Sequence, residues 1–282
     1  MQVVSDKKVL QEQLADWRHA GDRIALVPTM GNLHRGHGSL VDVARRHADR
    51  VVVSIFVNPT QFGEGEDFND YPRTLEPDVE LLAGIGADLL FAPEVDTVYP
   101  FGLEQATTIS VPFLNDQLCG SSRPGHFDGV TTVVARLFAL TRPDIAVFGK
   151  KDYQQQLIIR RMVADLNVPI DIITAPTVRE DDGLAMSSRN AYLSHAQRAV
   201  APALHATLLA IVKDLQQGDR NFLDLERRAI VSLSESGFQP DYVAVRCALD
   251  LGNPGRACEE IVVLGAAYLG TARLIDNITI AL

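Results

Sequence analysis

The 282-residue sequence predicts an α/β fold, in which a parallel sheet with helices on both faces precedes a smaller C-terminal α+β domain. In the first part of the chain, short apolar runs alternate with segments of helical spacing, which predicts alternating strands and helices. These runs are apolar throughout, as in strands that are buried on both faces. After about residue 176, two helical segments precede three strand-like runs. We therefore expect a Rossmann-like domain at 1–176 and a smaller α+β domain at 177–282.

Each expected element follows from a local pattern. In the first domain, strands are expected at 24–27, 51–57, 88–92, 144–148 and 170–174, and helices at about 38–48, 76–83, 129–140 and 153–166. In the second domain, we expect helices at about 195–216 and 222–236, and strands at 241–246, 261–268 and 272–280. Ligands of open parallel sheets bind beyond the carboxyl ends of the strands. A site is therefore expected in the post-strand loops 28–37, 58–65, 93–100 and 149–155, together with 176–190.

Composition narrows the class of protein. Lys and Arg number 26 and Asp and Glu 36, for a net charge of −10, which argues against broad nucleic-acid binding. Cys119, Cys247 and Cys258 form no C-x-x-C pair, and such an odd, scattered set indicates a reducing compartment. The first residues lack the apolar core of a signal peptide, and no stretch approaches the roughly 18 apolar residues of a membrane helix. We expect a cytoplasmic protein with no membrane and no nucleic-acid partner.

The loop at 28–37, PTMGNLHRGH, leaves a strand and enters a helix, whose N-terminus favours a phosphate group. Gly31 and Gly36 allow a ligand to approach the backbone closely. His34 and His37 can donate hydrogen bonds to phosphate oxygens as charge develops at an α-phosphate. Two surface histidines at a helix start are the simpler alternative, but the glycine-flanked setting favours function. Zinc is disfavoured, because it needs three or four ligands and no H-E-x-x-H occurs.

Three further loops carry weaker signals. After the strand at 144–148, Lys151 can neutralise phosphate and Gln155 can bond a hydroxyl, although a helix start capped by Asp152 explains the segment equally well. The loop Met186–Asn190 combines two serines with an arginine that could grip pyrophosphate, but such loops are usually solvated. Gln61 is expected to be exposed beside Phe62, where it would suit a small polar ligand. Asn58 could alternatively cap the end of the preceding strand.

Together these segments resemble the pantothenate synthetase (pantoate–β-alanine ligase) family, nucleotidyltransferases related to the class I aminoacyl-tRNA synthetases. The matching segments, in order, are VPTMGNLHRGH, VVVSIFVNPTQF, YPRTLEPD, SRPGHFDGVTTVV, PDIAVFGKKDYQQ, DGLAMSSRN and ARLIDN. The resemblance implies a two-step ligase. Pantoate first attacks the α-phosphate of ATP, giving pantoyl adenylate and pyrophosphate, and β-alanine then attacks the mixed anhydride, giving pantothenate and AMP. It also implies Mg²⁺, a homodimer and a mobile second domain that acts as a lid.

The resemblance assigns roles to individual residues. The catalytic group would be His37, as proton donor, with His34, Lys151, Ser187, Ser188 and Arg189. The ATP-binding residues would be Met30, Gly31, Asn32, Leu33, His34, Arg35, Gly36, His37, Gly149, Lys150, Lys151, Asp152, Val178, Met186, Ser187, Ser188 and Arg189. Pantoate would meet Gln61, Gln155, Val130, Val133 and Val134, and β-alanine would meet Gln61. Asp78 matches a position near the metal.

Three residues depart from the family pattern. Lys150 stands where an acidic residue is usual, Thr60 where methionine is common, and Gly38 where a larger residue is usual. Other activities compete with the ligase interpretation. The main alternative is an adenylyltransferase of the same superfamily that acts on a phosphorylated metabolite. A class I synthetase fragment and a non-catalytic nucleotide sensor are further hypotheses. The paired glutamines and the SRPGHFDGV segment favour a carboxylate substrate.

Overall fold

The computed structural model describes residues 1–281 except 64, 67 and 256–257. Contacts divide the chain into two compact units, which are described separately. Unit 1 comprises Met1–Gly149 and Ile158–Ala175, and unit 2 comprises Lys150–Leu157 and Pro176–Leu282. The segment Lys150–Leu157 thus groups with the C-terminal residues, whereas the sequence had suggested that it belongs to the first domain.

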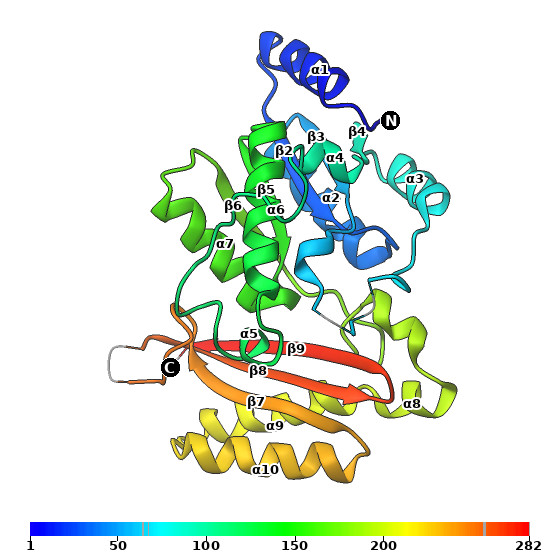
Figure 1. Ribbon diagram of the computed structural model, residues 1–282. Coiled ribbons are helices and arrows are strands. Elements are labelled where there is room, and N and C mark those ends of the chain that lie inside the picture. The colour runs from blue at the N-terminus through cyan, green and yellow to red at the C-terminus, as the bar shows by residue number, and fades with distance from the viewer. Residues whose placement is uncertain (64, 67, 256–257, 282) are drawn as a thin grey trace. The chain divides into compact units, whose positions relative to one another are not determined.

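Unit 1 is built on a six-stranded sheet in which every recorded strand pair is parallel (Figure 1). The order of the strands is β1-β4-β3-β2-β5-β6. The strands are β1 (Gln2–Val4), β2 (Ile24–Thr29), β3 (Arg50–Ile55), β4 (Leu89–Phe91), β5 (Ile145–Gly149) and β6 (Asp171–Ala175). The chain runs outward from β2 through β3 to β4 and then returns to β5, so β2 and β5 flank the point at which the strand order reverses. Ligands of such sheets bind at this point, beyond the carboxyl ends of the strands.

Helices cover both faces of the sheet, which explains the continuous apolar runs. Ile24, Ala25, Leu26 and Val27 in β2 are all fully buried, although successive side chains of a strand point to opposite faces. On one face, β2 and β3 share a core with α2 (Arg35–His47) and α3 (Leu75–Gly84). On the other face, α6 (His126–Thr141) packs against β2 and against α1 (Lys7–His19). The predicted fold class is confirmed.

Unit 1 also contains short helical segments that bring the loops into position. These are η1 (Pro59–Gln61), α4 (Val95–Val98) and α5 (Cys119–Ser122). Gly129 of α6 lies directly against η1, because a Cβ atom built on it would come within 2.4 Å of the Thr60 carbonyl oxygen. A glycine at this position therefore lets α6 support the turn that carries Gln61.

Unit 2 pairs an antiparallel sheet with helices. The strands β7 (Gln239–Cys247), β8 (Glu260–Leu269) and β9 (Ala272–Ala281) lie in sequence order. The helical segments are η2 (Lys150–Asp152), η3 (Ser188–Tyr192), α8 (His195–Val200), α9 (Ala203–Gln216) and α10 (Phe222–Glu235). α9 and α10 bury Leu208 and Leu233 against Val245 and Val263 of the sheet. α7 (Tyr153–Asp165) begins in unit 2 and continues into unit 1.

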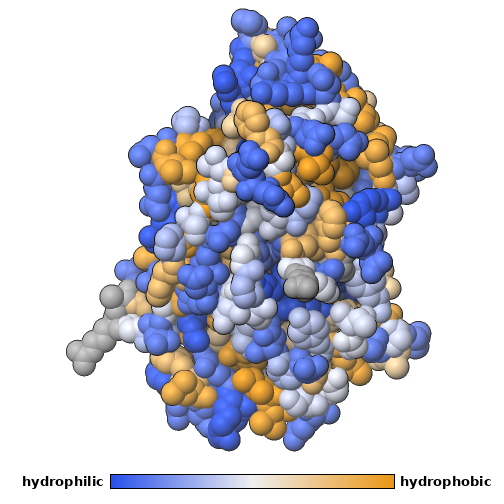
Figure 2. Space-filling model, in the orientation of Figure 1, coloured by the Kyte–Doolittle hydropathy of each residue, from blue (hydrophilic) through white to orange (hydrophobic). Residues whose placement is uncertain are grey.

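Several elements differ from the sequence-based expectations. The single helix expected at 195–216 is two helices separated by a turn at Ala201 and Pro202, where proline has no N–H to continue the helical hydrogen bonds. The expectations did not include α1, whose buried face consists of Leu10 and Leu14 and whose outer surface is hydrophilic (Figure 2). β1, a strand of three residues at the sheet edge, was also not expected. Among the described residues, no helix combines the length and apolarity needed to cross a bilayer.

Candidate functional site

A buried carboxylate fixes the turn that follows β2. Asp78, in the first turn of α3, accepts the backbone N–H of Asn32 at 2.9 Å and of Leu33 at 2.8 Å. Gly31 and Asn32 adopt positive φ values of 83° and 49°. A Cβ atom on Gly31 would lie 3.1 Å from the Asp78 carboxylate, so the close approach favours glycine. Asp78 therefore holds the backbone of this turn in one conformation before any ligand binds.

His34 and His37 cap α2 together. His34 is the N-cap residue, and its Nδ1 accepts the N–H of Gly36 at 3.1 Å. The Nδ1 atom of His37 accepts the N–H of His34 at 3.3 Å, and the two ring centroids are 4.2 Å apart. A neutral imidazole that accepts at Nδ1 carries its proton at Nε2. Both rings are therefore held as Nε2–H donors at the N-terminus of one helix, where negative charge is favoured.

Gln61 is buried, not exposed as the sequence suggested, with 8% of its surface accessible. Asn58 donates to the Gln61 side-chain oxygen at 3.2 Å and to the Gly129 carbonyl at 3.1 Å. Tyr99 donates to Asn58 Oδ1 at 2.7 Å, so Asn58 joins η1 to α6 and does not simply cap a strand end. The Gln61 amide nitrogen is 3.0 Å from the sulfur of Met30. The glutamine side chain is thus oriented toward the turn that precedes the histidines.

The other residues of unit 1 that were assigned to ligands lie around the same loops. Val130, Val133 and Val134 are buried in α6, directly after the glycine that contacts η1. Gly149 ends β5, and a Cβ atom on it would lie 3.9 Å from the side chain of Leu40 in α2. Arg35 is exposed and Gly36 is half-buried in the first turn of α2. The structure therefore gathers the predicted unit 1 residues around the ends of β2, β3 and β5.

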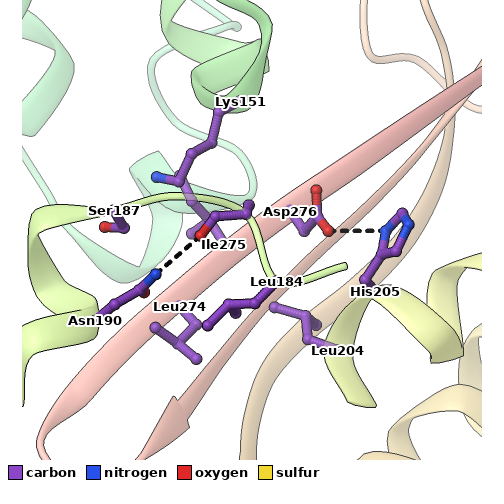
Figure 3. A pocket seen from close by; sticks show the side chains of 10 residues that line it. Lys151, Leu184, Ser187, Asn190, Leu204, His205, Leu274, Ile275 and Asp276 are labelled. Atoms are coloured by element: carbon purple, nitrogen blue, oxygen red, sulfur yellow. Dashed lines mark hydrogen bonds and ion pairs between the residues drawn. The ribbon is translucent and has the colours of Figure 1, made fainter. Parts of the chain in front are cut away.

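A hollow in unit 2 is lined by two of the predicted residues, Lys151 and Ser187 (Figure 3). It is lined by the polar residues Lys151, Ser187, Asn190, His205 and Asp276 and by the apolar residues Leu184, Ala185, Leu204, Leu274 and Ile275. Asn190 donates to the Ala185 carbonyl at 3.1 Å, which closes the loop that bears the serines. Lysine and serine side chains can both donate hydrogen bonds to anionic oxygens.

The remaining residues assigned to unit 2 are close to this hollow in the chain. The Ser187 hydroxyl oxygen accepts the N–H of Arg189 at 3.2 Å, and Ser188 begins η3. The N–H of buried Met186 donates to the Val178 carbonyl at 3.0 Å, which fixes the base of the loop. Asp152 ends η2, and Gln155 is half-buried in the first turn of α7.

The three departures from the family pattern have structural explanations. The Lys150 ammonium donates to Thr279 Oγ1 at 2.6 Å, so it is turned toward β9 and does not line the hollow. Thr60 bonds Asn58 Oδ1 at 3.1 Å and the Tyr99 hydroxyl at 3.2 Å. Gly38 lies in α2, where an added Cβ atom would make only an ordinary contact with Ile85. Of the three, Lys150 differs most from its expected role, which was to bind ATP, because its ammonium bonds Thr279.

Four residues of unit 2 were not identified as functional from the sequence. Arg179 makes two hydrogen bonds to the Asp276 carboxylate, at 2.7 and 2.9 Å, and His205 Nδ1 lies 3.1 Å from the same group. Burial alone would raise the pKa of Asp276, but the bonds from His205 and Arg179 outweigh it and hold that pKa below its usual value. Asn277 binds the backbone of Lys150 and Lys151. For Asp276 and Asn277 the available signal was the ARLIDN segment, whose role the sequence did not reveal; Arg179 and His205 lie outside it.

The Asp78 carboxylate, assigned to the metal, is already engaged by groups of the protein. Both of its oxygens accept backbone N–H groups, and Thr74 lies 3.3 Å from Oδ2. Within the described ranges, no group of three or more His, Cys, Asp or Glu side chains could hold a metal ion. Asp78 is thus an anchor of the turn, and the described part of the chain offers no magnesium cage made by protein groups alone.

Comparison with known proteins decides the family. A model of the family described as pantoate-beta-alanine ligase matches residues 2–279. The chain belongs to the pantoate–β-alanine ligase family. The chain is 56% identical to a pantothenate synthetase of Thioalkalivibrio sulfidiphilus over 282 residues, which is 100% of this chain and 99% of that protein. The resemblance inferred from the sequence motifs is therefore confirmed.

Solved structures of family members agree with this assignment. A pantothenate synthetase from Thermus thermophilus superposes with a TM-score of 0.89 at 46% identity and 99% coverage of both chains. A Francisella tularensis pantoate-beta-alanine ligase, solved with beta-gamma ATP and beta-alanine, has a TM-score of 0.77 at 35% identity, covering 99% of this chain and 97% of that one. The ligase is thus similar to these enzymes over its whole length.

Proposed function

We propose that the enzyme condenses pantoate with β-alanine at the expense of ATP, through a pantoyl-adenylate intermediate. A pantoate carboxylate oxygen attacks the α-phosphorus of ATP, and pyrophosphate leaves. The amine of β-alanine then attacks the acyl carbon, and AMP leaves as the C–N bond forms. Membership of the pantoate–β-alanine ligase family supports this reaction, as does the Francisella relative solved with beta-gamma ATP and beta-alanine.

The paired histidines at the start of α2 are the observation that carries the proposal. Their Nδ1 atoms accept backbone N–H groups, so Nε2 of each ring is the donor. Donors that are held in place before the reaction stabilise charge as it develops on the α-phosphate, without reorganisation. We assign His34 and His37 to the phosphates of ATP, where the Nε2–H of each ring donates a hydrogen bond. Met30, Gly31, Asn32, Leu33, Arg35 and Gly36 form the rest of this nucleotide-binding turn.

Lys151, Ser187, Ser188 and Arg189 are assigned to the phosphates that leave as pyrophosphate. Lys151 and Ser187 are among the residues that line the hollow of unit 2, and a lysine can act on phosphate as a point charge. Gly149 and Asp152 are assigned to phosphate and ribose, Val178 to the adenine, and Met186 to the loop that closes over the phosphates. Little covalent chemistry is required of the protein, because positioning and electrostatic stabilisation dominate reactions at phosphorus.

Gln61 and Gln155 are assigned to pantoate, and Gln61 also to β-alanine. The Gln61 amide donates to the Met30 sulfur, which is a weak acceptor. A substrate oxygen that replaced this sulfur would strengthen the hydrogen bond, so the amide is oriented without being strongly engaged. Val130, Val133 and Val134 would provide an apolar wall for the dimethyl carbon of pantoate.

Three further features of the enzyme belong to the proposal. ATP is used as its magnesium complex, in which phosphate oxygens supply much of the coordination, as is usual for this ion. The enzyme works as a cytoplasmic homodimer, and unit 2 closes over the bound nucleotide. These features are supported by the family resemblance of the sequence motifs. The alternative of an adenylyltransferase acting on a phosphorylated metabolite is not favoured by the comparisons.

The reaction is tested with ATP, magnesium and pantoate, with and without β-alanine, and the products are identified by mass. Free AMP should appear only when β-alanine is present. We expect His37→Ala to lower pantoate-dependent pyrophosphate release by at least about 10²- to 10³-fold, as for other groups that stabilise developing charge. Exposed His47, in the last turn of the same helix, provides the control His47→Ala, which should retain normal turnover. Near-normal turnover of folded His37→Ala would reject the assignment.

A further inference from the structure

Two adjacent residues of β9, Asp276 and Asn277, contact both segments that carry the phosphate-directed side chains of unit 2. We propose that this pair positions Lys151 and the loop Ser187–Arg189 in a fixed register to each other, an inference that rests on the proposed function. The two residues belong to the ARLIDN segment, to which the proposed reaction assigns no role. Asp276 and Asn277 are 4% and 5% exposed, so their contacts are made within the protein.

Asn277 holds the backbone of the lysine turn. Its side-chain nitrogen donates to the carbonyl oxygen of Lys150 at 2.8 Å and to that of Lys151 at 2.9 Å, across 126 residues in the second case. A primary amide has two N–H groups, which matches two carbonyl acceptors. A carboxylate of the same size would place an acceptor against both carbonyls. The contact therefore requires asparagine chemistry as well as its size.

A hydrogen bond of Lys150 to the same strand gives the two lysines different surroundings. Lys150 donates to Thr279 Oγ1 at 2.6 Å, on the same strand as Asn277, while Lys151 lines the hollow with Ser187 (Figure 3). The flexible four-carbon stem of a lysine does not by itself define where the ammonium lies. Asn277 of β9 holds the backbone of η2 at both lysines, because it binds the carbonyl oxygen of each. Of the two lysines, only Lys151 lines the hollow.

Asp276 holds the base of the serine loop. Its carboxylate binds Arg179 through two hydrogen bonds, and Arg179 also donates to the Gly183 carbonyl at 3.0 Å. Arg179 pairs with Ala185 as an isolated antiparallel bridge, two residues before Ser187. His205 contacts the same carboxylate at 3.1 Å. The conformation that leads into Ser187 is thus fixed by a carboxylate from β9.

The two anchors are coupled to each other. The N–H of Asn277 donates to Asp276 Oδ1 at 2.7 Å, so the carboxylate that holds Arg179 also orients the backbone of Asn277. Adjacent residues of a strand point to opposite faces, which lets one pair of residues reach two different segments. Misplacement by about 1 Å can reduce a rate about 10²-fold. The pair therefore acts on the reaction through Lys151 and the loop, without touching the substrate.

A double-mutant cycle tests the part of the proposal in which Asn277 positions Lys151. AMP formation is measured against ATP concentration for Lys151→Ala, Asn277→Asp and the double variant, with the other substrates saturating. We expect Asn277→Asp to lower kcat/KM for ATP about 10- to 100-fold in the parent enzyme. In the Lys151→Ala background the same change should have less than about a 2-fold effect, because its target is gone. Should Asn277→Asp not fold, Asn277→Ala removes the donors without adding an oxygen and takes its place.

The outcomes separate this inference from the proposed function. If Asn277→Asp lowers kcat/KM by the same factor in both backgrounds, its role is merely structural and the inference is overturned. In that case an impaired Lys151→Ala enzyme would still leave the proposed function standing. A Lys151→Ala enzyme of normal activity would overturn both. The adjacent residue, Ile278, packs against the core of unit 2, so Ile278→Val controls for a general disturbance of β9 and should leave kcat/KM unchanged. The cycle of Asp276→Asn with Arg189→Ala should show the same non-additivity for the loop.

Discussion

Unit 1 and unit 2 hold their phosphate-directed side chains in different ways. In unit 1, the rings of His34 and His37 accept backbone N–H groups two or three residues away at the start of one helix. In unit 2, Lys151 is fixed by Asn277, 126 residues away. The first arrangement is a local property of a turn and a helix cap. The second exists only when β9 has assembled with the rest of unit 2.

This difference predicts how each group responds to disturbance. Local capping forms with the helix itself, so the histidines should keep their orientation as long as α2 and its turn are intact. Contacts that are far apart in sequence depend on the cooperative packing of several elements. Lys151 and the serine loop should therefore be the more easily displaced group. Substitutions at Asp78, Asp276 and Lys150 test this difference between the two units most directly.

The largest effect is expected at Asp78, a distant anchor of the histidine turn. Asp78→Ala leaves the N–H groups of Asn32 and Leu33 without their buried acceptor, which should cost about 2–4 kcal/mol of stability. With the turn displaced, kcat/KM for ATP should fall about 100-fold. Urea unfolding followed by circular dichroism gives the stability, and AMP formation gives the activity.

A second variant at this position, Asp78→Asn, shows whether Asp78 is an anchor of the turn or a metal ligand. Asp78→Asn retains one acceptor oxygen and should lose less stability than Asp78→Ala. If Asp78 anchors the turn, the magnesium concentration for half-maximal activity should stay unchanged in Asp78→Asn. A large shift in that concentration with normal stability would instead support a metal-ligating role.

At Asp276 the anchor of unit 2 is tested through pH. The folded-state pKa of this carboxyl lies below its usual value, because hydrogen bonds from His205 and Arg179 outweigh the effect of burial, which is the largest single influence and raises the pKa. Its stabilising contribution is therefore present above the unfolded pKa of about 3.9 and is lost as pH falls through the folded value. Asp276→Asn should cost about 2 kcal/mol near neutral pH.

The pH dependence of that loss is the decisive measurement. The difference in unfolding free energy between parent and Asp276→Asn should shrink as the pH is lowered below about 4. Exposed Asp181 of the same unit provides the control Asp181→Asn, which should be close to neutral. A stability difference that stays constant down to about pH 2 would contradict the assignment of the loss to the ionised carboxylate.

The sequence predicted much of unit 1 because its signals are local. The run at 24–27 is apolar at every position, and its four residues are fully buried in the sheet as that pattern implied. The histidines were found because the turn, the glycines and the helix start are contiguous. The burial of Gln61 was missed, because it depends on α6 approaching η1 through Gly129. Nothing near Gln61 in sequence signals that approach.

In unit 2 the missing information is mostly non-local. The interruption at Pro202 had a local signal, the proline itself, which the expectation of one helix at 195–216 did not use. The contact of Asn277 with the lysine turn had none, because the two segments are joined only through the fold. The ARLIDN motif indicated that these residues matter to the family resemblance, without indicating which segments they contact.

The smallest effect is expected at Lys150, and a substitution there tests directly whether the two adjacent lysines have different roles. Its ammonium bonds Thr279, whereas Lys151 is among the residues that line the hollow. Lys150→Gln removes the charge and keeps a donor for Thr279, so the KM for ATP should change by less than about 2-fold, because the Lys150 ammonium is bonded to Thr279 and a lysine acts only where its ammonium lies. Lys151→Gln, measured in parallel, should raise it far more. Equal effects of the two changes would show that both lysines act on the phosphates, and β9 would then not separate their roles.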